Sequence, residues 1–303
     1  MFASHVAMMR PAAFGYNKET AENNEFQQTG FGTGRHLQQQ AIEAFNRLKF
    51  SLERAGVTVH EMADTLLPPK PDAVFLNNWF ACESGAIVLF PMEAESRRTE
   101  SREDIVFLLK EITGIQNVID WRHYTNESKF LEGTGSIVPD RVNRIAYACY
   151  SSRTNKDLFL SYCSQFHYKP LLFSATSKSG QNIYHTNVML CIGQTFAIIC
   201  SEAIQDKSER ENILSNLQNT GHTLLEISYN QMHKFCGNML ALENKQGCPV
   251  LVMSTKAYNS LTPDQLVYLN THTTIINADI DIIEQVGGGG VRCMLAELFM
   301  HPL

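Results

Sequence analysis

The chain has 303 residues, of which 44% are hydrophobic and 18% charged, and its formal net charge is −6. This composition is typical of a globular protein, and the negative charge gives no electrostatic reason to expect a nucleic acid or an anionic membrane as partner. No run of about eighteen apolar residues could form a membrane-spanning helix, and residues 1–10 lack the features of a signal peptide. We therefore expect a cytoplasmic protein.

Cysteine usage leads to the same expectation. Four of the eight cysteines, Cys149, Cys191, Cys200 and Cys236, lie inside apolar, strand-like runs. A reduced cysteine in such a run behaves as a small hydrophobic residue. The sequence contains no CxxC pair, which argues against a zinc ribbon or a thioredoxin-like site.

Amphipathic helices are predicted at four places along the chain. The first covers residues 37–55, where Ile42, Phe45, Leu48 and Leu52 form one apolar stripe and Gly56 acts as a stop signal. Similar patterns predict helices over residues 103–113 and 208–220. A fourth is predicted over residues 262–270, which begin with a capping threonine and a proline.

Between these helices, one kind of strand-rich segment returns five times. Each copy has a short apolar run, a polar or glycine-rich break and a second apolar run, as expected for strands buried in a sheet. The copies are AVFLNNWFACESGAIVLF from Ala73, FLEGTGSIV followed by RIAYACY, IYHTNVMLCIGQTFAIIC from Ile183, FCGNMLALENKQGCPVLVMS from Phe235, and GGGGVRCMLAELF from Gly287.

The spacing of these copies predicts an internal repeat. The polar residues at the first breaks are Asn78, Glu132, Asn187, Asn238 and Cys293, which are 54, 55, 51 and 55 residues apart. No linker rich in Gly, Ser or Pro interrupts the alternation, so we expect one closed α/β domain over residues 1–303. An open α/β sheet with coincidental spacing is the alternative.

Cys293 is the first candidate for chemistry. It follows the sequence GGGGVR, and four consecutive glycines usually mark a close approach of the backbone or positive φ angles. A cysteine beside Arg292 could occupy an electropositive site that favours the thiolate. A buried core cysteine after a flexible turn is the alternative. No Lys-Ser or Lys-Thr follows the glycines, so a phosphate-binding loop is not supported.

His185 and Glu132 are the other two candidates. A lone histidine at the start of an apolar strand is more often structural, and a carboxylate in LEGTGS could simply cap a helix. Together with Cys293, however, they occupy nearly equivalent positions in three of the repeats. If the repeats are arranged around an axis, these positions bring a thiol, an imidazole and a carboxylate to one centre. These are the groups needed for nucleophilic attack and proton transfer.

The order of motifs resembles the guanidino-group-modifying (pentein) superfamily. The relevant segments are SHVAMMRPAAFGYNKETAENNEF, PDAVFLNNW, FLEGTGS, YSSRTN, YHTNVML, FCGNML and GGGGVRCMLAELF, and they extend over nearly the whole chain. The superfamily includes arginine deiminases, dimethylarginine hydrolases and amidinotransferases. The chain looks especially like its bacterial citrulline-utilisation and amidinotransferase-like branch. The resemblance implies a five-bladed α/β propeller built from pseudo-fivefold ββαβ modules.

The resemblance also implies roles for individual residues. Cys293 would be the nucleophile and His185 the general acid and base, with Glu132 orienting His185 or contacting the substrate nitrogens. In the substrate-binding part, Asp72, Asn77 and Asn78 fall where dimethylarginine hydrolases have three acidic residues. Arg153, in YSSRTN, matches an arginine that binds the α-carboxylate, for which a planar bidentate donor is well suited.

Two departures from the superfamily pattern bear on the substrate. Residues 77 and 78 are asparagines rather than acids, and no aspartate stands two residues after His185. A guanidinium offers only donors and carries a charge, so a desolvated site for it needs carboxylates. A neutral ureido group has a carbonyl acceptor and suits amides better. The sequence therefore favours citrulline over arginine or methylated arginine, although Asp72 and Glu132 could suffice for arginine.

The expected reaction is hydrolysis through a covalent Cys293 intermediate, which needs neither a metal nor an organic cofactor. An amidinotransferase, an arginine deiminase, a dimethylarginine hydrolase and a non-catalytic propeller are the alternatives. The closely spaced His and Asp ligands of a metal-dependent ureohydrolase are missing. The expected partner is a small amino-acid substrate, with no nucleic acid or membrane, and a homodimer is left open.

Overall fold

The structure is a computed structural model that describes residues 2–31, 34–83 and 85–300. Within these residues, fifteen strands form five separate sheets of three strands each. The sheets are β15 (Ala296–Leu298), β1 (His5–Arg10) and β2 (Thr58–Ala63); β3 (Phe80–Glu83), β4 (Ala86–Leu89) and β5 (Val118–Asp120); β6 (Val138–Asp140), β7 (Ile145–Cys149) and β8 (Lys169–Phe173); β9 (Leu190–Ile192), β10 (Phe196–Ile199) and β11 (Thr223–Glu226); and β12 (Leu240–Glu243), β13 (Pro249–Ser254) and β14 (Thr274–Ala278).

All five sheets have the same topology. The middle strand pairs antiparallel with the strand before it and parallel with the strand after it, as β4 does with β3 and β5. The first sheet follows the same pattern with strands from both ends of the chain, because β1 pairs antiparallel with β15 and parallel with β2. The predicted fivefold repeat is therefore confirmed at the level of the sheets, and a single open sheet is not present in the described part of the chain.

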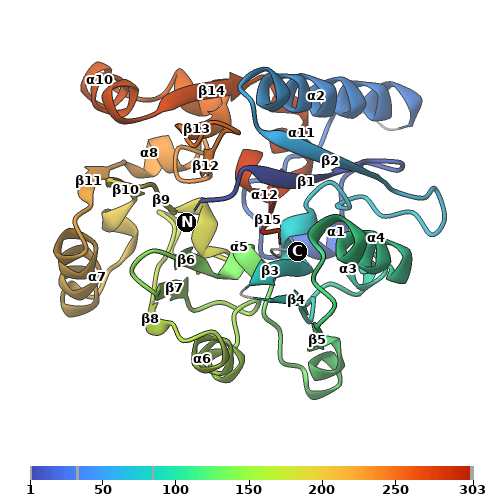
Figure 1. Cartoon of the computed structure of the whole chain (residues 1–303), viewed down its shortest axis with the longest axis horizontal. Coiled ribbons are helices and arrows are strands. Elements are labelled where there is room, and N and C mark those ends of the chain that lie inside the picture. Colours follow the sequence, from blue (N-terminus) through green and yellow to red (C-terminus); the bar gives the residue numbers. More distant parts are fainter. Residues whose placement is uncertain (1, 32–33, 84, 301–303) are drawn as a thin grey trace.

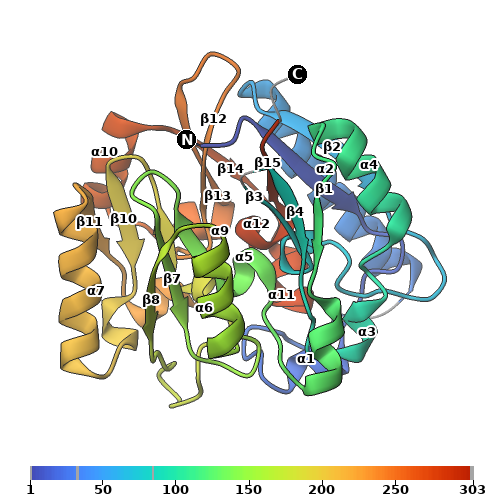
Figure 2. The same ribbon diagram turned by 60° about the horizontal axis from the view of Figure 1, so that its bottom comes forward.

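Each parallel pair needs a crossover connection, and in every sheet that connection contains a helix. The crossover helices are α2 (Arg35–Arg54), α4 (Glu103–Thr113), α6 (Lys156–Gln165), α7 (Lys207–Asn219) and α10 (Pro263–His272). They lie on the outside of the molecule in Figure 1, and Figure 2 shows α7 at the left edge of the molecule. Shorter helices are α1 (Lys18–Ala21), α3 (Glu95–Arg98), α5 (Gly133–Ser136), α8 (Tyr229–Met232), α9 (Thr255–Tyr258), α11 (Asp281–Gly287) and α12 (Val291–Met294).

The four predicted helices are all found, within a few residues. In α2, Phe45, Leu48 and Leu52 are buried as expected, whereas Ile42 is only partly buried. Helix α4 has the predicted bounds, and α10 begins with a complete capping box in which Thr262 and Gln265 exchange hydrogen bonds. Helix α6 was not predicted, and it begins where the Asn155 side chain caps two backbone N–H groups.

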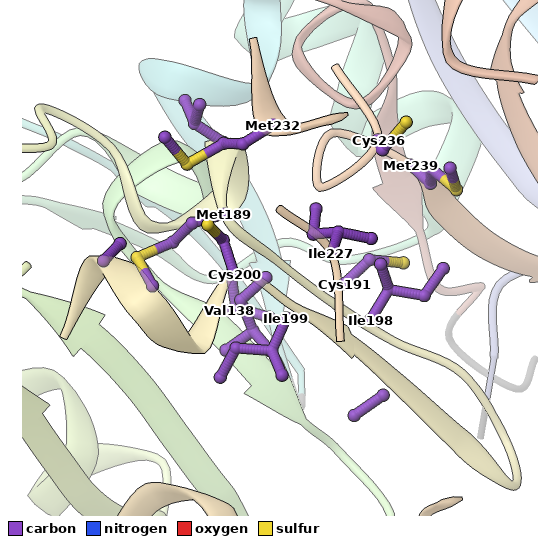
Figure 3. Packing of buried hydrophobic residues seen from close by; sticks show 14 of the residues in the cluster. Val138, Met189, Cys191, Ile198, Ile199, Cys200, Ile227, Met232, Cys236 and Met239 are labelled. Atoms are coloured by element: carbon purple, nitrogen blue, oxygen red, sulfur yellow. The ribbon is translucent and has the colours of Figure 1, made fainter. Parts of the chain in front are cut away.

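The cysteines of the strand-rich segments are part of the apolar core. Figure 3 shows Cys191, Cys200 and Cys236 among isoleucine and methionine side chains. These three and Cys149 are free and buried, and of the eight free cysteines only Cys248 is exposed. Their expected behaviour as small hydrophobic residues is confirmed.

The short turns that precede the inner strands lie at the centre of the molecule. Figure 1 shows α5 and α12 near the middle, inside the ring of crossover helices. The corresponding turns in other modules are the 3₁₀ helices η1 (Leu76–Asn78) and η3 (Thr186–Val188), and α5 contacts both of them. The turns that carry the polar residues of the first breaks therefore lie close together, as expected from their equivalent positions in the repeat.

Candidate active site

A pocket of about 270 Å³ lies beside these central turns. It is lined by residues of the N-terminal segment, of the turns of several modules and of the loop of consecutive glycines. The lining residues are Thr20, Asn24, Gln27, Asp72, Phe75, Asn78, Arg97, Arg153, Tyr184, His185, Gly287, Gly288, Gly289 and Cys293. Cys293 and His185 thus share one pocket, while Glu132 lies behind the histidine.

His185 and Glu132 form a fully buried pair. The His185 Nε2–H donates to Glu132 Oε2 at 2.8 Å, which leaves Nδ1 as the nitrogen that can exchange a proton with the pocket. The other carboxylate oxygen, Oε1, accepts the backbone N–H of Glu93 at 3.0 Å. Glu132 therefore fixes both the tautomer and the orientation of the imidazole.

The environment of this pair determines its charge. Burial lowers the pKa of His185 to about 4, despite the opposing effect of Glu132. Burial alone would raise the pKa of Glu132, but Arg153 and the hydrogen bond from His185 outweigh it and bring that pKa to about 2. At neutral pH the site therefore holds a carboxylate and a neutral imidazole.

Cys293 lies in α12, directly after the glycine loop. Its backbone N–H donates to the carbonyl oxygen of Gly290 at 3.1 Å, and its side chain is only 4% exposed. Burial raises the pKa of the thiol, because the thiolate would lose its hydration. The resting site therefore contains a thiol, not a preformed thiolate.

Two buried arginines line the pocket. Arg153 donates through Nη2 to the Thr20 carbonyl oxygen at 3.0 Å and to Asn23 Oδ1, and its Nε has no hydrogen-bond partner in the described part of the chain. Arg97 is more fully engaged, because Nε and Nη2 bind the two carboxylate oxygens of Glu100, each at 2.9 Å. Arg153 is nevertheless paired by charge, because its Nε lies 3.5 Å from Glu93 Oε2 and its Nη1 lies 3.6 Å from Glu132 Oε2.

The predicted substrate-binding residues Asp72, Asn77 and Asn78 have different environments. Asp72 lines the pocket and accepts hydrogen bonds through Oδ2 from Asn17 and Thr20, while burial raises its pKa against the effect of Arg97. Asn78 also lines the pocket. Asn77 does not line it; its Nδ2 donates to Thr134 Oγ1 at 3.2 Å, because neighbouring side chains of a 3₁₀ turn point in different directions.

Several lining residues were not predicted from the sequence. Arg97 is in a short polar helix, α3, whose sequence ESRR reads as a solvated surface. Thr20, Asn24 and Gln27 belong to the N-terminal segment, for which no role was assigned. That segment is held over the glycine loop by hydrogen bonds from Asn24 and Gln27 to the carbonyl oxygens of Gly288 and Gly287.

The described part of the chain contains neither a metal-binding cluster nor a membrane-spanning helix. Among residues 2–31, 34–83 and 85–300, no group of three or more His, Cys, Asp or Glu side chains could hold a metal ion. No helix in the same ranges is long and apolar enough to span a membrane.

Comparisons with known proteins agree with this architecture. The family model described as "N,N dimethylarginine dimethylhydrolase, eukaryotic" matches residues 10–300. A search of curated protein sequences finds no significant match.

Solved structures show the same fold at low sequence identity. ArgZ, a cyanobacterial arginine dihydrolase, superposes with a TM-score of 0.76 at 15% identity over 99% of this chain, which spans only 41% of that protein. The N-terminal domain of ArgZ bound to substrate has a TM-score of 0.75 at 15% identity, with 98% of both chains covered. A dimethylarginine dimethylaminohydrolase adduct with S-methyl-L-thiocitrulline has a TM-score of 0.67 at 16% identity, with 98% of this chain and 100% of that chain covered.

The lowered pKa of His185 predicts a loss of stability in acid. Its ordinary pKa is 6.5 and its folded value about 4, so the unfolded chain binds a proton between these values that the folded chain does not. Stability should therefore fall as the pH drops from about 6.5 to 4, by on the order of 1–3 kcal/mol from this group. Urea unfolding of the wild type and His185→Gln between pH 7 and 4 should show a shallower pH slope in the variant, and parallel slopes would contradict the assignment.

Gly135 predicts a steric requirement at the centre of the site. A Cβ atom at this position would lie 2.5 Å from Asn78 Nδ2 and 2.8 Å from His185 Nδ1. Gly135→Ala should therefore displace both side chains and lower kcat by about a hundredfold, because such displacements misplace reacting groups. Gly15→Ala is the control, since no heavy atom lies within 4 Å of a Cβ there. Steady-state kinetics with equal activity for the two variants would disprove the close approach.

Proposed function

This chain belongs to the eukaryotic N,N-dimethylarginine dimethylhydrolase family of C–N hydrolases, within the guanidino-group-modifying superfamily, and we propose that it hydrolyses the ureido group of citrulline or a similar amino acid. The proposal rests chiefly on the orientation of Asn78. We also propose that the chain is a member of the bacterial citrulline-utilisation branch of this superfamily.

The Asn78 amide has one orientation that satisfies its surroundings. Arg97 Nη1 donates to Asn78 Oδ1 at 2.8 Å, and a guanidinium can only donate. The Nδ2 group must therefore point the other way, and it is buried with no hydrogen-bond partner among the described residues. A buried, unpaired N–H group needs an acceptor. A ureido carbonyl supplies one, whereas a guanidinium does not.

The charges on the pocket wall also favour a neutral reacting group. Among the described residues, Asp72 is the single acidic side chain that lines the pocket, whereas two guanidinium groups, those of Arg97 and Arg153, line it. The carboxylates that pair with these arginines, on Glu100, Glu93 and Glu132, do not line the pocket. A substrate with an anionic carboxylate and a neutral ureido group fits this balance. The Arg153 Nε, which lies 3.5 Å from Glu93 but makes no hydrogen bond among the described residues, suits the α-carboxylate. The unpaired acceptor Oδ1 of Asp72 suits a substrate N–H.

The proposed mechanism uses Cys293 and His185 in both half-reactions. The thiol passes its proton to the imidazole, and the sulfur attacks the ureido carbon. The imidazolium returns that proton to the departing nitrogen, the C–N bond breaks, and ornithine leaves a carbamoyl group on the sulfur. Water then loses a proton to His185 and attacks this group. The C–S bond breaks, the thiolate recovers a proton, and carbamate decomposes to ammonia and carbon dioxide.

Arginine is the second candidate substrate, because ArgZ is an arginine dihydrolase and AgrE has been solved with L-arginine. A dihydrolase would attack arginine first and the resulting citrulline second. Amidino transfer, dimethylarginine hydrolysis and a purely binding role are further alternatives, and only the last dispenses with Cys293.

We further propose that the five sheets are the blades of one closed propeller domain, in a cytoplasmic protein. Neighbouring sheets are in contact through β15 and β3, β6 and β9, and β9 and β12. The fifth and first modules are joined by a hydrogen bond from the Glu243 N–H to the Ala3 carbonyl oxygen at 3.0 Å. The outer limits of the predicted domain, residues 1 and 303, lie outside the described residues.

Product analysis tests the proposed reaction. The purified protein should convert citrulline to ornithine and ammonia, and Cys293→Ala should abolish this conversion because the covalent intermediate cannot form. Amino-acid chromatography and an ammonia assay would measure both. Ornithine from arginine as well would identify a dihydrolase, citrulline as the end product would identify a deiminase, and unimpaired turnover by Cys293→Ala would refute the mechanism.

Asn78→Asp tests the basis of the substrate preference. The change replaces the free N–H donor with a carboxylate acceptor while Arg97 keeps its partner. The kcat/KM for citrulline should fall by about 10- to 100-fold relative to that for arginine, as expected for a hydrogen bond that involves a charged group. Asn77→Asp is the matched control, because that side chain lies outside the pocket lining. An unchanged ratio in Asn78→Asp would remove the argument for citrulline.

A further inference from the structure

The sulfur of Cys293 is surrounded by two asparagine side chains. Asn238 places Nδ2 at 3.3 Å and Oδ1 at 3.6 Å from Sγ, while Asn187 places Nδ2 at 3.7 Å and Oδ1 at 3.9 Å from it. Both side chains are at most 1% exposed. Two buried amides therefore lie within hydrogen-bond distance of the sulfur.

The Asn238 amide is held in place from several sides. Its Nδ2 also donates to the backbone carbonyl oxygen of Asn187 at 3.0 Å. A Cβ atom on Gly290 would lie 2.7 Å from Asn238 Oδ1, so the glycine loop packs directly against the amide. The same close packing occurs behind it, where a Cβ on Gly237 would lie 2.2 Å from the Val188 carbonyl oxygen. The amide cannot swing away without moving two central turns.

The cation next to Cys293 in the chain does not hydrogen-bond the sulfur. Arg292, next to Cys293 in the chain, directs Nη1 to the Leu295 carbonyl oxygen at 2.9 Å and Nη2 to Glu297 at 2.8 Å. Across the described ranges, the side-chain N–H groups that hydrogen-bond the sulfur come from Asn238 and Asn187 alone. Asn238 is the nearer donor.

We propose that Asn238 is a catalytic residue whose Nδ2–H stabilises the negative charge on the Cys293 sulfur whenever the thiolate forms, with Asn187 as a weaker second donor. The inference rests on the proposed function only in taking Cys293 as the nucleophile.

An amide is suited to this task because it serves both states of the sulfur. The thiol can donate to Oδ1, and the thiolate can accept from Nδ2 without rotation of the side chain. The amide itself gains and loses no proton. The thiol proton goes to His185 in the first half-reaction, and the thiolate is expelled again when the C–S bond breaks in the second. Asn238 would therefore act in both steps by donating one hydrogen bond in a water-poor site.

The test measures the ionisation of Cys293 without substrate. In a Cys248→Ser parent, which lacks the exposed thiol, the rate of Cys293 alkylation by iodoacetamide is followed by mass spectrometry as a function of pH. Asn238→Ala and the near-isosteric Asn238→Asp should each move the midpoint of this profile upward by at least about one pH unit. They should also lower kcat by about 10- to 100-fold, the loss expected for a hydrogen bond to a charged group.

Asn187→Ala is the comparison variant and should move the midpoint less than Asn238→Ala. Asn238→Ser, which keeps a shorter donor, should give an intermediate midpoint and provides a test if the other variants fold poorly. An unmoved midpoint in folded Asn238 variants would assign the residue a merely structural role and overturn the inference. A larger effect of Asn187→Ala would overturn it as well. Absence of alkylation in the parent would instead count against Cys293 as nucleophile, and so against the proposed function.

Discussion

The short turn before the inner strand of each sheet is the constraint on which the site depends. The same ββαβ topology repeats five times, so the residues at these turns meet at the centre although they are about fifty residues apart in sequence. Their side chains differ: Asn78 faces the pocket, Glu132 orients His185, Asn187 and Asn238 surround the sulfur, and Cys293 carries it. One structural repeat therefore supplies most of the polar groups that a covalent hydrolysis needs.

Burying these groups has an electrostatic cost that the fold offsets by pairing. Glu132 is completely buried, and it stays ionised because Arg153 lies 3.6 Å away and His185 donates to it. For the imidazole, burial outweighs the effect of Glu132, and for the thiol it outweighs the hydrogen bond from Asn238 and the charge of Arg292, so both groups are neutral at rest. Charge is thus created on the sulfur only during the reaction, and hydrogen-bond donors placed in advance matter more there than a permanent cation.

Sequence patterns predicted the repeat, the four amphipathic helices and the convergence of Cys293, His185 and Glu132. These predictions succeeded because helices and strands follow from the local spacing of apolar residues, and equivalent residues of a repeat follow from its regular length. Arg97 and the N-terminal residues Thr20, Asn24 and Gln27 escaped prediction, since their positions depend on tertiary contacts of short, polar segments. Adjacent identical residues were also indistinguishable: only the 3₁₀ geometry of η1 turns Asn78 toward the pocket and Asn77 toward Thr134. Asn187 and Asn238 were recognised as markers of the repeat, but their contact with the sulfur required coordinates.

The amide of Asn78 has a proposed role that goes beyond the charge of the substrate. A carboxylate in the place of Asn78 would accept from Arg97 equally well, but it would present a second acceptor to the pocket instead of an N–H group. Because Arg97 fixes the Oδ1 side of residue 78, the remaining atom would be a donor in asparagine and an acceptor in aspartate. The guanidinium is itself held by Glu100 and by the Phe75 carbonyl oxygen at 3.1 Å, so it cannot turn to relieve a mismatch. Under the proposed function, selection between a ureido and a guanidinium group would therefore depend on a rigid pair, Arg97 and Asn78, rather than on the net charge of the pocket alone.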